Sequence, residues 1–363
     1  VTALRASRVA VETASINLPD RAPVDLSSQE REEADRTFYV KGLRAPAILR
    51  ALCRSLFQHP LGFLRGFRMA VQLGGTDLIA ILKRIAYLLE AILIGDWMKQ
   101  RKLNHLHVHF ATPAATVALL NKCVYGFPFS MTVHGPDEFY SVDEYHLEKK
   151  IENASFVCCI GSYCRSQLMR LSHPHEWAKF EVSPLGVDAS EFCFAKTEEH
   201  SDDTFRILCV GRLVPAKGQG VLIQAAKELT RRGRAVQVVF AGDGPDRSRL
   251  ESLAGHLGVD ANCRFLGAVN PDKVRELYAQ ADLFVLPSFA EGIPVVLMEA
   301  MAMGVPCVST LINGIPELIE SGNQGILVPP SDSVALCGAI EALMDDDGLR
   351  RALAHAARQK VVD

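Results

Sequence analysis

Residues 205–244 read FRILCVGRLVPAKGQGVLIQAAKELTRRGRAVQVVFAGDG, and this stretch decides the fold. It contains two apolar, β-branched runs, RILCVGR and AVQVVFAGDG, on either side of the amphipathic helical pattern VLIQAAKEL. A strand, a helix and a second strand in this order indicate a parallel sheet, because parallel neighbours need a long crossover connection. The stretch therefore predicts a βαβ unit of an α/β domain.

The same alternation continues in both directions along the chain. Further strand-like runs are HLHVHFA, FSMTVH, SFVCCIG and FEVSPLGV before the stretch, and CRFLGAV, LFVLPS, PCVSTL and GILVPP after it. Repeated βα units are typical of doubly wound parallel sheets covered on both faces. The acidic run TEEHSDDT separates the two sets. We predict a Rossmann-like N-terminal domain over 1–190, a linker over 191–204 and a second such domain over 205–363.

The composition is that of a globular enzyme of two domains. The chain has 363 residues, 48% hydrophobic and 22% charged, and a formal net charge of −3. This charge argues against nucleic acid as the main partner. No signal peptide is visible, and the most apolar stretch, 78–95, is interrupted by Lys83, Arg84 and Glu90. We therefore expect a cytoplasmic protein in which this stretch does not span a bilayer.

Residues 41–102 differ from the rest of the chain in charge. They contain eleven Lys or Arg and three acidic residues, a net charge of +8. The cations accompany apolar runs such as PAILRALCRSLF and PLGFLRGFRMAV, which predicts an interfacial helix against anionic lipid. Ordinary amphipathic helices that cover the sheet are the alternative.

The most informative motif is LPSFAEGIPVVLMEAMAMGVP, residues 286–306. It predicts a strand end, a loop with Glu291, and a helix that begins near Pro294 and ends at Gly304. Glu299 is the only polar residue of VVLMEAMAM, so its carboxylate needs hydrogen-bond donors, from the backbone or from a ribose. The amides at the helix start suit a phosphate, and we assign four donors to it: Gly292, Ile293, Val295 and Val296.

Three further loops follow predicted strands, where doubly wound sheets bind ligands. Arg212 and Lys217 follow RILCVG, and two cations there suit a diphosphate, although solvated surface cations are the alternative. Gly242 and Gly244 resemble a dinucleotide fingerprint that lacks its third glycine. His134 follows MTV at a predicted ligand-facing edge, with a purely structural histidine as the alternative.

Taken together, these residues resemble the family 4 (group 1) glycosyltransferases, over about residues 105–345. The resemblance is carried by the E-x7-E pair Glu291 and Glu299, with VGRLVPAKG, GDGP and FLGAV upstream. It implies the GT-B fold, two facing Rossmann-like domains with an interdomain cleft. The EGIP variant, VETASIN and RTFYV are most similar to enzymes that build colanic acid and related bacterial exopolysaccharides.

The resemblance also implies roles for the site residues. Arg212 and Lys217 would bind the donor diphosphate, Glu299 the ribose, and Glu291 a hydroxyl of the transferred sugar. His134 would face the sugar across the cleft. The backbone near the base would come from Gly267 and Val269.

The implied activity is a retaining transfer of a sugar from a UDP or GDP donor to a glycan or lipid-linked acceptor, without a metal ion or other cofactor. The Asp-x-Asp of Asp345 to Asp347 has a polar helix-end context, so we expect a solvated acidic run there. The enzyme would act in the cytoplasm, at the periphery of the inner face of the membrane.

Two departures from the family pattern leave alternatives open. The family's opening strand and glycine loop do not appear before Val1, and its closing helix does not appear before Asp363. We therefore expect the first strand to be missing. The alternatives are a truncated protein that binds sugar nucleotides without turnover, another GT-B enzyme such as an epimerase, and a nicotinamide-dependent enzyme, which the incomplete glycine fingerprint disfavours.

Overall fold

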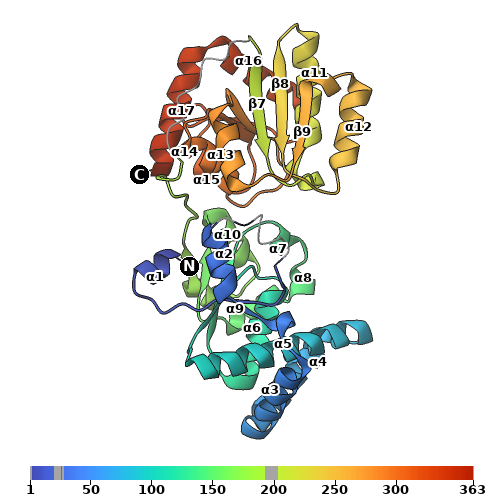
Figure 1. The fold of residues 1–363 in the computed structure, drawn as a ribbon, viewed down its shortest axis with the longest axis vertical. Helices are drawn as coiled ribbons and strands as arrows, with labels where there is room; N and C mark the ends of the chain where they lie inside the picture. Colours follow the sequence, from blue (N-terminus) through green and yellow to red (C-terminus); the bar gives the residue numbers. More distant parts are fainter. Residues whose placement is uncertain (1, 20–25, 27, 193–202, 363) are drawn as a thin grey trace. The chain divides into compact units, whose positions relative to one another are not determined.

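The computed structural model describes residues 2–19, 26, 28–192 and 203–362. It divides into two compact units (Figure 1), which we describe separately. The first comprises Val1–Cys159 and Arg165–Ser183, and the second comprises Ile160–Cys164 and Pro184–Asp363. The linker predicted at 191–204 lies mostly outside the described residues.

The second unit is built on a parallel sheet with the strand order β12-β11-β10-β7-β8-β9. Its strands are β7 (Phe205–Val210), β8 (Val236–Ala241), β9 (Cys263–Gly267), β10 (Leu283–Leu286), β11 (Cys307–Thr310) and β12 (Ile326–Val328). The chain adds β8 and β9 on one side of β7, then returns to pair β10 with its other side. This reversal is a topological switch point, where such sheets bind ligands beyond the strand ends.

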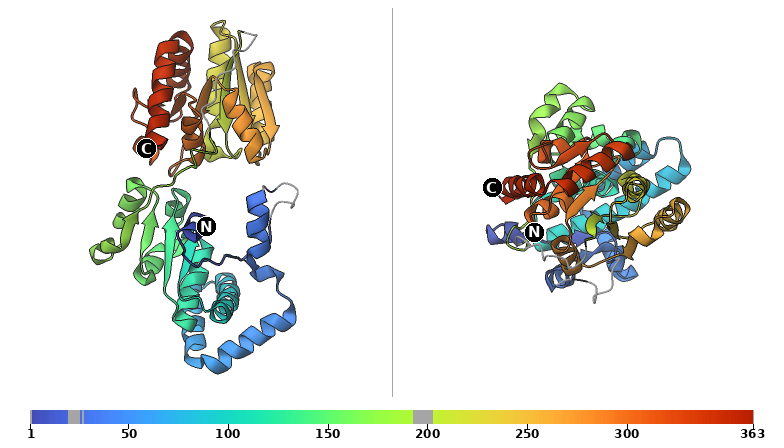
Figure 2. Two further views of the ribbon diagram at one scale, coloured as in Figure 1. Left: turned by 60° about the vertical axis from the view of Figure 1, so that its left-hand side comes forward. Right: turned by 90° about the horizontal axis from the view of Figure 1, so that it is seen from above.

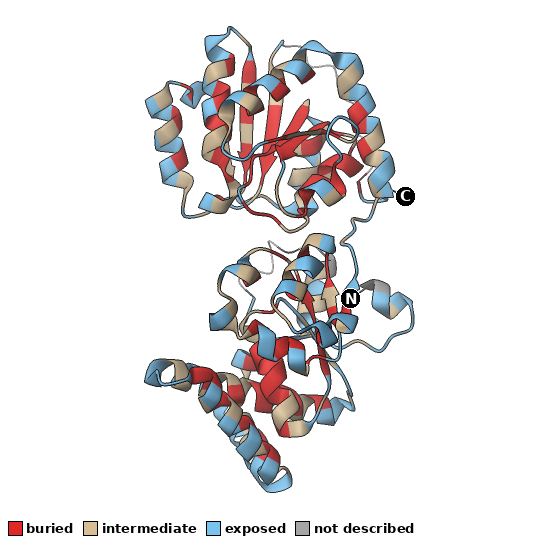
Figure 3. Ribbon diagram, turned by 180° about the vertical axis from the view of Figure 1, so that it is seen from behind, coloured by how far each residue is buried: buried red, intermediate tan, exposed pale blue. Residues whose placement is uncertain are grey.

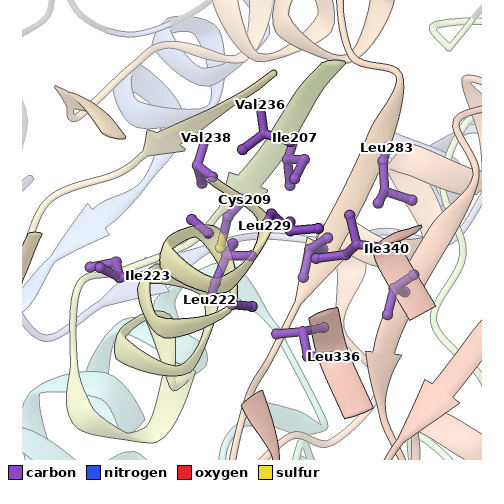
Figure 4. Packing of buried hydrophobic residues seen from close by; sticks show 14 of the residues in the cluster. Ile207, Cys209, Leu222, Ile223, Leu229, Val236, Val238, Leu283, Leu336 and Ile340 are labelled. Atoms are coloured by element: carbon purple, nitrogen blue, oxygen red, sulfur yellow. The ribbon is translucent and has the colours of Figure 1, made fainter. Parts of the chain in front are cut away.

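Helices cover both faces of this sheet (Figure 1). One layer contains α11 (Gln219–Arg231), α12 (Arg247–Leu257) and α16 (Ser333–Asp345); the other contains α13 (Pro271–Ala279), α14 (Val295–Ala302), α15 (Ile315–Leu318) and α17 (Asp347–Val362). Along β7, Ile207 and Cys209 pack into the first layer (Figure 4), whereas Leu208 and Val210 pack into the second. Burial on both sides explains why this strand is continuously apolar.

The first unit contains a parallel four-stranded sheet in the order β3-β4-β5-β6. The strands are β3 (Leu106–His109), β4 (Phe129–Val133), β5 (Val157–Cys159) and β6 (Phe180–Val182), each inside a predicted run. Between them lie α6 (Pro113–Tyr125), α7 (Asp137–Tyr140), α8 (Val142–Tyr145), α9 (Leu147–Asn153) and α10 (Ser162–Arg170). Helix α6 begins at a proline and ends at Gly126, whose φ of 78° suits a glycine cap.

The N-terminal part of this unit is mostly helical (Figure 2). It contains α1 (Thr2–Ala6), β1 (Ala14–Ser15), α2 (Ser28–Arg36), β2 (Phe38–Tyr39), α3 (Ala45–Gln58), α4 (Pro60–Gly74) and α5 (Leu78–Arg101). Strand β1 is short and pairs only with the two residues of β2. Within the described residues, no helix combines the length and apolarity that a bilayer crossing requires.

Candidate functional site

A partly buried ion pair lies at the switch point of the second unit. Lys217 follows β7 and Glu291 follows β10, and Lys217 Nζ lies 2.6 Å from Glu291 Oε1. Ser288 Oγ donates a second hydrogen bond of 2.6 Å to the same oxygen. Glu291 is only 6% exposed and Ser288 is fully buried. The cation and the hydroxyl compensate the cost of burying the carboxylate.

A glycine allows the two loops to meet. Gly218 has a φ of 63°, and a Cβ atom there would lie 2.1 Å from the carbonyl oxygen of Pro287. Beside this contact the Phe289 amide donates to the Ala216 carbonyl oxygen at 2.8 Å. The short distance requires glycine at 218, and the backbone contact holds Lys217 next to the β10 loop.

Arg212 provides a second, uncommitted cation in the β7 loop. Its carbonyl oxygen accepts a 2.9 Å hydrogen bond from Gln219 Nε2, which fixes the backbone. Its side chain is exposed, and within the described part of the chain its guanidinium has no hydrogen-bond or ion-pair partner. The loop therefore presents one engaged and one unengaged cation at the end of β7.

Helix α14 starts beside Glu291, one residue later than the sequence suggested. Pro294 is its N-cap rather than a residue of its first turn, and the Pro294 carbonyl oxygen accepts from the Leu297 amide at 3.1 Å. The four donors predicted for phosphate precede that amide. Among the described residues none of these has an acceptor: Gly292, Ile293, Val295 and Val296. Their amides are available for an anion at the positive end of the helix.

Glu299 lies in the middle of α14 and meets a tyrosine that the sequence did not single out. Tyr278 is fully buried, and its hydroxyl lies 3.0 Å from Glu299 Oε2 and 2.9 Å from the Val296 carbonyl oxygen. Burial raises the pKa of Glu299, while the Tyr278 bond and the Arg275 charge oppose that shift. One hydroxyl proton is shared between two acceptors, so the half-buried carboxylate keeps capacity for further donors.

The predicted glycines pack against the β7 loop. A Cβ atom at Gly242 would lie 2.1 Å from the Gly211 carbonyl oxygen, and one at Gly244 would lie 2.3 Å from that of Leu213. The Gly242 amide donates to the Gly267 carbonyl oxygen at 2.9 Å. These contacts give Gly242 and Gly244 a structural role, and their contact with a donor stays a prediction. Val269 is half-buried against the apolar cluster on the α13–α14 side of the sheet. Its place near the nucleotide base also stays a prediction.

His134 follows β4 in the first unit, at the predicted position. Its Nε2 atom lies 3.1 Å from Nδ1 of His109, and burial lowers its pKa. Glu138, which the sequence did not single out, accepts the amides of His134 at 2.6 Å and Gly135 at 2.9 Å. The carboxylate therefore fixes the backbone that carries His134. The residues gathered at the switch point all belong to the second unit.

A buried lysine supports the same edge of the first sheet. Lys150 Nζ donates to the carbonyl oxygens of Ala111 at 2.7 Å and Thr112 at 2.9 Å. Burial lowers the pKa of Lys150 to about 7. Glu138 accepts the Ala111 amide from the other side. Together the two side chains tie the loop after β3 to the loop after β4.

The Asp-x-Asp sequence is engaged in local contacts. Asp345 pairs with Arg234, and Asp347 lies 2.6 Å from Arg350. The Asp346 carboxylate accepts the Leu349 amide at 2.8 Å, at the start of α17. Among the residues that the structure describes, no group of three or more His, Cys, Asp or Glu is arranged to hold a metal ion.

Comparison with known proteins identifies relatives of part of the chain. Residues 194–360 match the family model described as glycosyl transferases group 1. The chain is 41% identical over 156 residues to the alpha-D-kanosaminyltransferase of Streptomyces kanamyceticus, covering 43% of this chain and 40% of the relative. It is 36% identical over 210 residues to the putative colanic acid biosynthesis glycosyltransferase WcaL of Escherichia coli K12, covering 56% and 51%. The chain thus spans about half or less of the length of these two relatives.

Solved structures show the same architecture. HepE of Anabaena, solved in complex with UDP and glucose, superposes with a TM-score of 0.66 at 21% identity, over 74% of this chain and 75% of HepE. At this identity the likeness shows the fold alone. It confirms the predicted α/β, GT-B fold class.

Proposed function

We propose that this chain, whose residues 194–360 match the group 1 glycosyl transferase family model, transfers a sugar from a nucleoside diphosphate to a glycan or lipid-linked acceptor. The observation that carries the proposal is the set of anion and hydroxyl partners at the β7–β10 switch point. It combines two cations, the unengaged amides at the start of α14 and two carboxylates within one unit. A nucleoside diphosphate sugar offers complementary groups to each.

The cations and amides would hold the diphosphate. Arg212 is exposed and unpaired within the described residues, and the amides of Val295 and Val296 lie at the positive end of α14. Lys217 would share its charge between Glu291 and the distal phosphate. Negative charge develops on the departing diphosphate in glycosyl transfer, so these donors would stabilise the transition state.

The carboxylates would hold hydroxyl groups. Glu299 would accept the ribose hydroxyls, since Tyr278 leaves it with spare acceptor capacity. Glu291 would accept a hydroxyl of the transferred sugar through Oε2, which has no hydrogen-bond partner among the described residues. The backbone of Gly267 and Val269 would lie against the base, and His134 would face the sugar.

We propose a retaining mechanism that requires no metal ion. The acceptor oxygen would bond to the anomeric carbon on the face from which the diphosphate leaves. The acceptor proton would pass to an oxygen of the departing phosphate. Arg212 and Lys217 would supply the positive charge that this leaving group needs. No enzyme nucleophile takes part in this scheme.

We further propose that the enzyme works in the assembly of a bacterial exopolysaccharide or cell-surface polysaccharide, with a UDP or GDP donor. The likeness to WcaL supports this assignment. The enzyme would act in the cytoplasm, and the basic residues of 41–102 would bring the N-terminal unit to the anionic inner face of the membrane. A lipid-linked acceptor would be met there.

Titration calorimetry with a panel of nucleoside diphosphates, followed by donor hydrolysis and transfer assays, tests the proposal. Glu299→Ala should weaken nucleotide binding, because it removes the acceptor for ribose. Glu291→Ala should lower turnover more than affinity. Parent-like binding and transfer by both variants would refute the assignment. Nucleotide binding without any turnover by the parent protein would favour the non-catalytic alternative instead.

A further inference from the structure

Helix α4 buries mostly small residues and exposes several large apolar ones, which reverses the usual arrangement in a helix of a water-soluble domain. Four of its five buried residues are small and follow a four-residue spacing, Gly62, Gly66, Ala70 and Gly74; the fifth is Leu73. Three of its large apolar residues are exposed to solvent: Leu61 is 75% exposed, Leu64 62% and Phe67 42%. A helix in water normally buries its large apolar residues and exposes its small or polar ones.

The small residues are required by close packing. A Cβ atom at Gly62 would lie 2.0 Å from the carbonyl oxygen of Val124 on α6, and one at Gly66 would lie 2.6 Å from the Val124 side chain. Larger residues could not occupy this side without moving α6. Small residues between helices, with large apolar residues outside, form the pattern of helices that pack within lipid.

Both neighbouring helices also expose large apolar residues. Nine exposed large apolar residues between 49 and 82 form what we call the α3–α5 apolar face: Leu49, Leu56, Phe57, Leu61, Leu64, Phe67, Leu78, Ile79 and Leu82. Phe57 and Ile79 are 81% and 77% exposed. The outer sides of helices in this part of the first unit are pale blue in Figure 3. Exposed apolar residues gathered in this way mark an interaction surface.

The positive charges on α3 and α4 favour an anionic partner. Helices α3 and α4 carry four arginines, Arg50, Arg54, Arg65 and Arg68, and no acidic residue. Arg65 and Arg68 are exposed on α4, and within the described residues neither forms an ion pair. Arginines beside exposed Leu and Phe complement a surface that is anionic outside and apolar beneath, as an acidic phospholipid layer is.

We infer that the α3–α5 apolar face inserts into the interface of an anionic bilayer, with α4 lying along the membrane plane. The 15 residues of α4 are too few to cross the hydrocarbon core, which takes about 20. The leucines and Phe67 enter the headgroup and acyl boundary while the arginines contact lipid phosphates. This inference rests on the membrane position proposed above, and it adds insertion of apolar side chains to attraction between charges.

Depth-dependent fluorescence quenching distinguishes insertion from surface attraction. We expect the emission of Leu64→Trp to shift to shorter wavelength with phosphatidylserine vesicles, and acyl-brominated lipid to quench it. Val334, 69% exposed on α16, provides the matched control: Val334→Trp should show neither change. Co-sedimentation of Leu64→Trp with the vesicles, without a shift or quenching, would overturn the inference.

A second comparison uses binding itself. Both leucines are exposed, so Leu61→Ser and Leu64→Ser should fold with an unchanged Tm. Each should weaken binding to phosphatidylserine vesicles about tenfold, the value of burying one leucine. Unchanged vesicle binding by both variants would overturn the inference. If the parent protein instead forms a dimer in sedimentation analysis and the variants do not, the face binds a second copy of the chain. Nucleotide binding should be unchanged in both variants, so this test fails or succeeds independently of the donor-site proposal.

Discussion

Lys217 Nζ lies 2.6 Å from Glu291 Oε1, although the two residues are 74 positions apart in the sequence. The ion pair joins the loops that follow β7 and β10 without any ligand, so Lys217 has a structural task in addition to the binding task proposed for it. Arg212, in the same loop, makes no such contact within the described residues. Variants of the two cations should therefore differ in stability even where they agree in binding.

Arg212→Ala and Lys217→Ala should each weaken nucleoside diphosphate binding by roughly 1.5 to 3 kcal/mol, the range for hydrogen bonds to charged groups. Only Lys217→Ala should also lower the free energy of unfolding, by about 1 to 3 kcal/mol, because it leaves the Glu291 carboxylate buried without its cation. Calorimetry and urea denaturation measure the two effects. The matching nucleoside is the control, and an equal loss of nucleoside affinity would indicate a folding defect and withdraw the phosphate assignment.

Nucleotide affinity should depend on the ionisation of Glu299. Burial raises the pKa of Glu299 above its ordinary value of 4.5, so affinity should fall as the pH drops through the raised pKa and the carboxylate loses an acceptor position. Tyr278→Phe removes an opposing hydrogen bond and should move that midpoint to higher pH. Affinity measured against pH for both proteins checks this. The same midpoint in both proteins would show that the Tyr278 hydroxyl does not affect the pKa of Glu299. Glu299→Gln, which lacks the carboxylate, should show no midpoint.

Stability should rise with pH through Lys150. Its pKa is about 7 in the folded protein, lowered from 10.5. Between these values the unfolded chain holds a proton that the folded chain lacks, so the free energy of unfolding increases with pH. The slope of the free energy of unfolding against pH should be steeper in the parent protein than in Lys150→Met, by up to about 1.4 kcal/mol per pH unit. Urea denaturation of both proteins at pH 7, 8 and 9 measures the difference, and parallel profiles would contradict the buried, neutral amine.

Gly242→Ala should destabilise the protein by about 1 to 3 kcal/mol, because the new methyl group would collide with the Gly211 carbonyl oxygen. Gly255 in α12 is the control, since nothing lies within 4 Å of a Cβ atom there. Gly255→Ala should stabilise by about 0.5 to 1 kcal/mol. Denaturant midpoints compare the two. A Gly242→Ala protein as stable as the parent would show that the β7 loop can move aside.

The strands of the two larger sheets could be predicted because most of them are apolar or β-branched runs, although β3 alternates between half-buried and exposed residues. FRILCV is β7 itself, and the reversal after β9 follows from no local pattern. The sequence therefore does not predict which residues contact Glu291 and Glu299. Ser288 reads as an ordinary loop serine, and Tyr278 as one aromatic residue of a helix. Ser288 lies three positions before Glu291, and their contact depends on the conformation of that one loop. Tyr278 lies 21 positions before Glu299, and their contact arises only when α13 packs beside α14.

In the first unit, the sequence indicated basic and apolar helices over 41–102 but not which side of each helix is covered. Hydrophobicity alone would place Leu61 and Leu64 inside and the glycines outside. The close approach of Val124 on α6 to Gly62 instead places the glycine side of α4 inside the protein. This contact joins segments that are far apart in the chain. Glu138 was missed for a similar reason, because its three partners are backbone amides, which any sequence supplies.

The pairing of β7 with β10 has a consequence for synthesis on the ribosome. Two complete βα units, β8 with α12 and β9 with α13, are made between these neighbours in the sheet. A nascent chain that ends before β10 has the Lys217 loop but lacks its partner Glu291, and one edge of β7 is unpaired. Nucleotide bound at the proposed donor site would stabilise the finished domain by mass action, but a precursor without Glu291 and α14 lacks part of that site. The open edge of β7 in such a precursor is a place where another strand can pair.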